Sequence, residues 1–140
     1  MTTATTAQPY RFRPLWNALG WTMVVSVLVL SLMPLSVDLS EDGDKVSHFI
    51  AYGSLMFWFG MVFPRRQNQV VSALGFVAMG IAVEYLQRMT GYRSFDVADM
   101  AANAVGVAAG WVLVRSPIRR LLPWIDRILQ RQAGILARRK

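Results

Sequence analysis

Residues 84–103 read EYLQRMTGYRSFDVADMAAN and lie between two apolar runs of the 140-residue chain. The stretch holds three carboxylates, two arginines, a glutamine and an asparagine. Polar groups are costly inside or beside hydrocarbon, so a chain that keeps this many there is expected to use them. We interpret the rest of the chain as a scaffold that holds this stretch opposite a second polar segment, DKVSHFIAY at residues 44–52.

The composition is typical of a membrane protein. The chain is 54% apolar and its mean hydropathy is +0.35, so it is more apolar than an ordinary soluble domain of this length. The net charge is +7, and the basic residues flank the apolar runs. This placement favours contact with anionic lipid over contact with nucleic acid. The absence of cysteine excludes disulfide frameworks and thiolate metal sites.

Four apolar runs predict four transmembrane helices. Each run falls near the range of about 17–25 residues that crosses a bilayer as a helix. The first run lacks a following A-x-A-like site, which favours an uncleaved span over a signal peptide. The predicted fold class is therefore all-α, a polytopic four-helix transmembrane bundle. The runs are Leu15–Leu35, Val46–Phe63, Val70–Leu86 and Val97–Val114.

The chain divides into a disordered tail at 1–14, the transmembrane domain at 15–114 and a basic amphipathic helix at 115–140. In the last part, apolar residues recur at helical spacing and arginines cover the other face. Such a helix is expected to lie on the membrane surface and to attract anionic lipid. Nucleic-acid binding is the weaker alternative. The apolar residues are Ile118, Leu121, Leu122, Ile125, Ile128 and Leu129.

The distribution of lysine and arginine predicts that both termini are cytoplasmic. With this orientation the acidic loop at 36–45 lies outside, the second and fourth helices begin outside, and the third ends there. Polar side chains from three helices then meet at one depth near the outer interface. They are Asp44, Lys45, His48 and Tyr52, then Glu84 and Gln87, then Arg93, Asp96, Asp99 and Asn103.

His48, Glu84 and Asp99 are the candidate catalytic residues. His48 is the only histidine and is suited to act as acid, base or nucleophile near neutral pH, oriented by Asp99 or Glu84. The other residues are candidates for ligand binding. Lys45, Arg93 and two helix N-termini suit an anion such as phosphate. This second group is Asp44, Lys45, Tyr52, Gln87, Arg93, Asp96 and Asn103.

Each assignment has a structural alternative. Asp44 and Asp96 are suited to cap helices, Arg93 to pair with a nearby carboxylate, and the buried residues to form a packing network. A metal site is only weakly indicated, because one imidazole with carboxylates is a poor ligand signature, and no cofactor motif is found. Gly106 and Gly110 form a G-x-x-x-G motif, which suits close helix contact within the chain or in a homodimer.

Together these motifs resemble the VanZ-like family of bacterial membrane proteins, over residues 15–114. The resemblance implies a small helical protein of the bacterial inner membrane. Founding members of that family are associated with reduced susceptibility to the glycopeptide antibiotic teicoplanin. The motifs are D-K-x-x-H-F-x-x-Y at 44–52, E-x-x-Q at 84–87 and R-S-x-D-x-x-D-x-x-x-N-x-x-G at 93–106.

Two hypotheses for function follow. In the first, the outer site binds an anionic lipid-linked cell-envelope intermediate, such as a polyprenyl phosphate; whether it also hydrolyses a phosphoester or phosphoanhydride stays open. The partners are then membrane lipids and not nucleic acid. In the second, the protein is non-catalytic and the polar cluster is a structural network or a subunit interface. A transporter is a distant third, because four short spans leave little room for a path.

Overall fold

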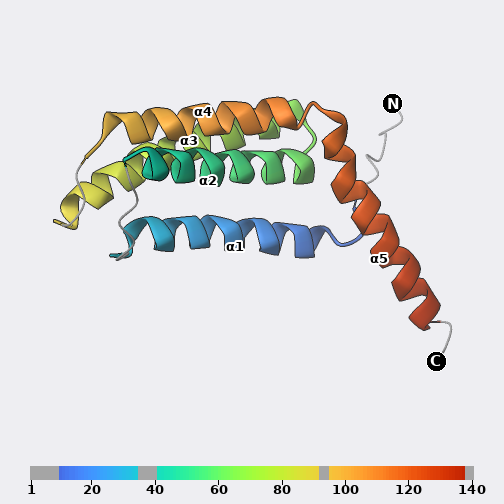
Figure 1. Cartoon of the computed structure of the whole chain (residues 1–140). Coiled ribbons are helices and arrows are strands. Elements are labelled where there is room, and N and C mark those ends of the chain that lie inside the picture. Colours follow the sequence, from blue (N-terminus) through green and yellow to red (C-terminus); the bar gives the residue numbers. More distant parts are fainter. Residues whose placement is uncertain (1–9, 35–40, 92–94, 138–140) are drawn as a thin grey trace, which may run out of the picture.

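The protein is described by a computed structural model over residues 10–34, 41–91 and 95–137, and these residues form helices and no strand. Four helices lie side by side along one direction, and the fifth points away from them (Figure 1). The all-α prediction is confirmed for the described residues. The elements are α1 Arg13–Leu32, α2 Glu41–Val62, α3 Arg66–Met89, α4 Val97–Leu113, a 3-10 helix η1 Pro117–Arg120 and α5 Leu121–Ala137.

Among the described helices, α1 and α3 are long and apolar enough to cross a membrane. α4 and the helical segment Pro117–Ile135 make a third span only if the 69° bend between them is a break within one span. α4 has 17 residues, and α2 carries several charged residues in its first turns. The chain therefore has the apolar helices of a membrane protein, while the number of four spans stays a prediction.

The start of α2 differs from the prediction. The loop predicted at 36–45 is wrong from residue 41 onward, because α2 begins at Glu41 and not at Val46. Acidic residues in a first turn interact favourably with the positive end of the helix dipole, which explains why this polar stretch joins the helix. Residues 35–40 of the predicted loop lie outside the described residues, as do residues 1–9 of the predicted tail. Of the rest of that tail, Arg13 and Pro14 are the first residues of α1, and Tyr10 is buried, with its hydroxyl donating to the carbonyl of Met61 at 2.7 Å.

The closest contact in the fold joins α2 to α4. A Cβ added at Gly106 would collide with the backbone carbonyl of Phe49, and one added at Gly110 would collide with the carbonyl of Gly53. Both glycines of the G-x-x-x-G motif are buried. The close helix contact that the motif predicts thus occurs within the chain. The homodimer through the same glycines stays a prediction.

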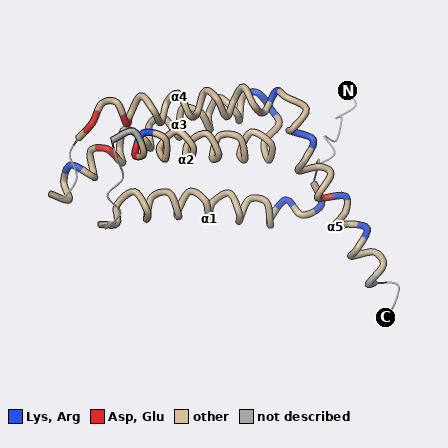
Figure 2. Tube along the Cα trace, in the orientation of Figure 1, with Lys and Arg blue, Asp and Glu red and all other residues tan. Residues whose placement is uncertain are grey.

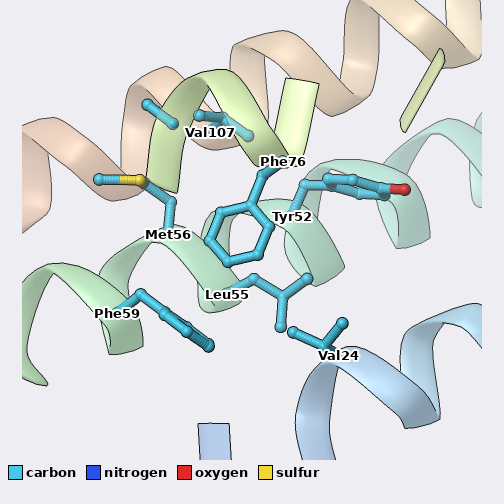
Figure 3. Packing of buried hydrophobic residues seen from close by; sticks show 8 residues of the cluster. Val24, Tyr52, Leu55, Met56, Phe59, Phe76 and Val107 are labelled. Atoms are coloured by element: carbon cyan, nitrogen blue, oxygen red, sulfur yellow. The ribbon is translucent and has the colours of Figure 1, made fainter. Parts of the chain in front are cut away.

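The main core fills the space that α2 shares with α1, α3 and α4. Figure 3 shows the side chains of Tyr52, Leu55 and Phe59 on α2 packed towards Phe76 on α3 and Val24 on α1. The rings of Phe59 and Phe76 meet edge to face, with centroids 5.2 Å apart. This geometry is favourable for aromatic pairs. α2 is thus the central helix, and it fixes the positions of the other three.

Near the opposite end of α2 from Glu41, a buried glutamine joins three helices. Gln69 on α3 donates from Nε2 to the carbonyl of Gly60 on α2 at 3.0 Å. Its Oε1 accepts from the indole Nε1 of Trp111 on α4 at 3.3 Å. Both ends of this side-chain amide therefore have partners. Such bonds offset the cost of burying a polar group among apolar helices.

Asp126 attaches α5 to the start of α1. Its buried carboxylate accepts from Trp16 Nε1 at 2.8 Å, from the backbone N–H of Arg11 at 3.0 Å and from that of Phe12 at 3.1 Å. It also accepts from Gln130 Nε2 at 2.6 Å. Burial raises the pKa of Asp126, but the four hydrogen bonds outweigh burial and hold the pKa of this carboxyl below its ordinary value.

Gly110→Ala tests the contact between α2 and α4. The added methyl group has no space beside the Gly53 carbonyl, so we expect the free energy of unfolding to fall by about 1–3 kcal/mol, the usual cost of overpacking. Thermal unfolding of the detergent-solubilised protein measures this loss. Gly75→Ala is the control, because a Cβ at Gly75 meets nothing within 4 Å. Equal stability of the two variants would contradict the close contact.

Asp126→Asn tests the attachment of α5. Removing the charge weakens hydrogen bonds that are each worth about 1.5–3 kcal/mol, so amide hydrogen exchange in α5 should become about tenfold faster or more. Because the folded pKa is lowered, the carboxylate stabilises the attachment at neutral pH and this stabilisation is lost as pH falls below about 4. Wild-type protection of α5 should fall on acidification, and protection in the variant should not. The same acid-induced loss in both proteins would contradict this role.

Candidate functional site

Acidic residues gather at one end of the α1–α4 bundle. Figure 2 shows them at the end where α2 and α4 begin and α3 ends, together with basic residues, among them Lys45 on α2 and Arg88 in the last turn of α3, and it shows further basic residues at the opposite end. The acidic end holds most of the residues predicted to form the site. We call the group Asp44, Lys45, His48, Glu84, Asp96, Asp99 and Asn103 the acidic-end cluster.

His48 lies at the centre of the acidic-end cluster and is 5% exposed. Its Nδ1 lies 3.0 Å from Oδ1 of Asn103 on α4. An amide oxygen only accepts hydrogen bonds, so Nδ1 is the donor, and in the neutral ring Nε2 then presents its lone pair. Nε2 faces two carboxylates, Asp44 Oδ1 and Asp99 Oδ2, each at 3.9 Å.

The close approach of the helices lets α4 present its polar face to His48. Asp99 and Asn103 are one turn apart on α4, and both are buried. A Cβ added at Gly80 on α3 would lie 2.9 Å from Asn103 Nδ2, so this glycine makes the room that the amide occupies. Small residues on the neighbouring helix therefore position the group that orients the histidine.

The cluster has a half-exposed rim above a buried floor. At the rim, Lys45 Nζ lies 3.6 Å from Asp96 Oδ2, and their side chains are 33% and 43% exposed. Below the rim, Asp99 is 7% exposed and Glu84 and Asn103 are each 1% exposed. A ligand that approaches this end of the bundle thus meets charged side chains first and buried hydrogen-bonding groups next.

Glu84 and Asp96 connect α3 to the start of α4. The backbone N–H of Asp96 donates to Glu84 Oε1 at 2.6 Å, and Asp96 Oδ1 accepts from the N–H of Ala98 at 2.8 Å. Asp96 therefore caps α4, the structural alternative that the sequence had left open. Asp44 does not cap α2, because this helix begins at Glu41. The residue expected to orient His48 was Asp99 or Glu84. The atom within hydrogen-bond distance of Nδ1 is instead Oδ1 of Asn103.

The structure places two predicted ligand-binding residues away from the rim. Gln87 is 2% exposed, and its Nε2 donates to the carbonyl of Ser31 at 2.9 Å, which joins α3 to α1. Tyr52 is fully buried, and its ring belongs to the core (Figure 3). Arg93, the predicted phosphate-binding arginine, lies outside the described residues.

The electrostatic environment differs from the predicted anion site. The acidic-end cluster holds four carboxylates, one lysine and one imidazole. The Ala98 N–H at the start of α4 donates to Asp96, and α2 begins nearly two turns before His48. The described part of the cluster therefore attracts cations, and an anion there needs additional positive charge.

Buried polar atoms without a partner gather in the same region. Over the described residues five such side-chain atoms are found, and four of them are Tyr52 Oη, Glu84 Oε2, Asp99 Oδ1 and Asn103 Nδ2. The fifth is Asn17 Oδ1 on α1. Gln69 and Asp126 are equally buried, yet their polar atoms are paired. An unpaired buried polar atom costs about 1–3 kcal/mol, so a water molecule, an ion or a ligand beside these atoms would be stabilised by them.

Sequence reasoning missed two of the buried polar residues, Gln69 and Asp126. Neither belongs to a motif: Gln69 precedes the predicted third span, and Asp126 lies in the helix predicted on the membrane surface. A usable signal existed for Asp126, because an acidic residue interrupts the apolar stripe of a helix that otherwise carries arginines. For Gln69 the sequence holds no such signal, because this residue ends the polar stretch RRQNQ at 65–69, just before the predicted third span.

The family profile described as VanZ/LLP1 matches residues 3–121. This match covers most of the chain, including all of α1 to α4. The chain belongs to the VanZ/LLP1 family. The predicted resemblance is confirmed, and the match extends beyond the predicted range of 15–114 into η1.

This VanZ/LLP1 protein also resembles a protein of the fission yeast Schizosaccharomyces pombe that is described as uncharacterised. The two are 34% identical over 73 residues, which cover 50% of this chain and 45% of the yeast protein. The chain therefore spans less than half the length of that relative. The predicted restriction of the family to bacteria is too narrow, because this relative is eukaryotic. No solved structure matches the chain.

The single histidine allows a direct test of the geometry. A protein labelled with 15N only in histidine gives the signals of His48 alone. In the neutral ring we expect Nδ1 to be protonated and Nε2 to be unprotonated, because Asn103 accepts from Nδ1. The variant Asn103→Leu should lose this preference. A wild-type ring with its proton on Nε2 alone, or identical spectra for both proteins, would contradict the arrangement.

Proposed function

We propose that this VanZ/LLP1 protein is an integral membrane protein of four spans whose acidic-end cluster binds the phosphate headgroup of a lipid. The observation that carries the proposal is the set of unpaired buried polar atoms below a charged rim. A network that served only to pack helices would be expected to satisfy its members, because partly paired buried groups are costly. The unpaired buried atoms could form hydrogen bonds with a polar group that enters from the headgroup layer.

The proposed orientation follows from charge. Arg13, Arg65, Arg66 and Arg115 lie at one end of the α1–α4 bundle, and the acidic residues lie at the other end with only Lys45 and Arg88 among the described basic residues (Figure 2). The positive-inside rule then assigns both termini to the cytoplasm and the acidic-end cluster to the outer leaflet. α5 would lie on the inner surface, where its exposed apolar residues Leu121, Trp124 and Ile128 can enter the headgroup region.

Phosphate is a ligand chemistry that bacteria and yeast share, and at this site it would need positive charge in addition to Lys45. Polyprenyl phosphates and phospholipids occur in bacteria and in yeast, whereas peptidoglycan precursors occur only in bacteria. A ligand recognised through its phosphate can therefore serve the whole family. In a bacterium such a ligand includes lipid-linked cell-envelope intermediates, and a link to glycopeptide susceptibility would follow from their handling.

A hydrolytic step is a further part of the proposal. His48 Nε2 would take a proton from a water molecule, whose oxygen forms a new bond to phosphorus while the bond to the leaving oxygen breaks. The Asn103 contact holds the ring so that Nε2 faces the cluster, and Lys45 at the rim would bind the phosphate oxygens. Asp99 would stabilise the imidazolium that forms.

A structural role is the second candidate, and specific bonds favour it. Glu84 and Gln87 each join two helices, through the Asp96 N–H and the Ser31 carbonyl. Asp96 caps α4. If the cluster serves only to hold the bundle together, its substitutions lower stability and leave lipid binding unchanged.

Native mass spectrometry of the detergent-released protein decides between these two candidates. Polyprenyl phosphate and an uncharged lipid of similar chain length are offered together to the wild type and to His48→Ala. We expect selective retention of the phosphate lipid by the wild type and at least about tenfold weaker retention by the variant. Conversion to the free alcohol and phosphate would establish hydrolysis.

Gln69→Leu is the matched control, because Gln69 is a buried polar residue that ties helices at the other end of the bundle. It should lower thermal stability and retain the lipid as the wild type does. Unselective retention by the wild type, or equal retention by wild type and His48→Ala, would refute the headgroup site and support the structural role.

A further inference from the structure

We infer that Asp44, His48 and Asp99 form a binding site for one divalent transition-metal ion. The three ligand atoms, Asp44 Oδ1, His48 Nε2 and Asp99 Oδ2, lie within 4.8 Å of one another. Nε2 is 3.9 Å from each carboxylate oxygen. Three ligands that surround an ion at about 2.2 Å in a trigonal arrangement are roughly 3.8 Å apart, so small side-chain movements suffice to close the site.

The orientation of the His48 ring supports a cation at this position. With Nδ1 beside the oxygen of Asn103, Nε2 is directed towards two carboxylate oxygens, and its lone pair faces them in the neutral ring. Three electron-rich atoms that face one another repel, and the distances exceed hydrogen-bond length. A cation between them turns this repulsion into attraction. Asn103 then has the role of the outer partner that usually fixes the ring orientation of a metal-binding histidine.

A separate observation also points to a ligand here. Asp99 is only 7% exposed, and its second oxygen, Oδ1, is buried without a hydrogen-bond partner. A carboxylate that is buried on α4 and half paired is costly unless a cation neutralises it. Glu84 Oε2 is buried and unpaired in the same cluster, which adds to the negative potential.

The ligand set indicates the class of metal. Mg²⁺ and Ca²⁺ prefer oxygen ligands alone, whereas one imidazole with two carboxylates suits Mn²⁺ or Zn²⁺. Three protein ligands leave coordination positions for water or for a phosphate oxygen. The inference deepens the phosphate-binding part of the proposed function, on which the role of the ion rests: the metal would supply the positive charge that a phosphate needs beside four carboxylates. In the metal-bound protein the Nε2 lone pair of His48 is occupied, so His48 would then not be the base of the hydrolytic step.

The test uses the metal alone. The full-length protein in detergent is stripped with a chelator and titrated with Mn²⁺, and the free ion is measured by electron paramagnetic resonance, with Zn²⁺ as competitor. We expect one ion per chain, and an affinity at least about tenfold lower in His48→Gln and in Asp99→Asn. Asp126→Asn removes a buried carboxylate from α5 and should bind as the wild type does.

A second measurement needs no variant. In the wild-type protein labelled with 15N-histidine, Zn²⁺ should shift the Nε2 signal of His48 and leave Nδ1 protonated. Absence of stoichiometric binding, equal affinity of wild type and His48→Gln, or a His48 spectrum that the metal leaves unchanged would each overturn the site. If the protein binds metal but does not retain phosphate lipid, the proposed function is refuted and this inference stands. If the protein retains phosphate lipid but binds no metal, this inference is refuted and the proposed function stands.

Discussion

The contact between α2 and α4 is the constraint on which the rest of the structure depends. Gly106 and Gly110 bring the backbones of the two helices so close that a Cβ at either position would meet a carbonyl of the facing helix. Between apolar helices, association relies on such packing, because lipid and side chains are similarly apolar. The same approach sets His48 on α2 within hydrogen-bond distance of Asn103 on α4. The close approach of α2 and α4 at these glycines therefore determines both the helix packing and the position of the candidate site.

Buried polar side chains differ between the two ends of the α1–α4 bundle in whether their polar atoms have hydrogen-bond partners. At the basic end, Gln69 and Asp126 use their polar atoms in full, and each joins elements that are distant in sequence, while Asn17 Oδ1 near the start of α1 is an unpaired exception. At the acidic end, Asp99 and Glu84 are equally buried but each keeps an oxygen without a partner. The chain is thus able to satisfy buried polar groups where they only support the fold. This contrast gives the acidic end its functional interpretation.

The helices and the meeting of the polar segments could be predicted because both follow from simple patterns. Apolar runs of sufficient length predict helices, and alternate directions place the start of α2, the end of α3 and the start of α4 together. The partners could not be predicted. Whether Gln87 faces a ligand or the Ser31 carbonyl depends on the rotation of α3, and the extension of α2 back to Glu41 depends on local electrostatics that hydropathy does not record.

The main difference between the predicted site and the observed one is the sign of the electrostatic potential, which is negative around the described residues of the site. Sequence reasoning counted Lys45, Arg93 and helix N-termini in favour of an anion, but Asp96 uses a free N–H of α4, and Lys45 lies beside Asp96. Nε2 of His48 faces the carboxylates of Asp44 and Asp99. A phosphate ligand in this environment needs more positive charge than Lys45 supplies, because the Coulomb repulsion between like charges grows as the dielectric constant falls. A cation held by Asp44, His48 and Asp99 would supply that charge, which links the proposed headgroup site to the proposed metal site.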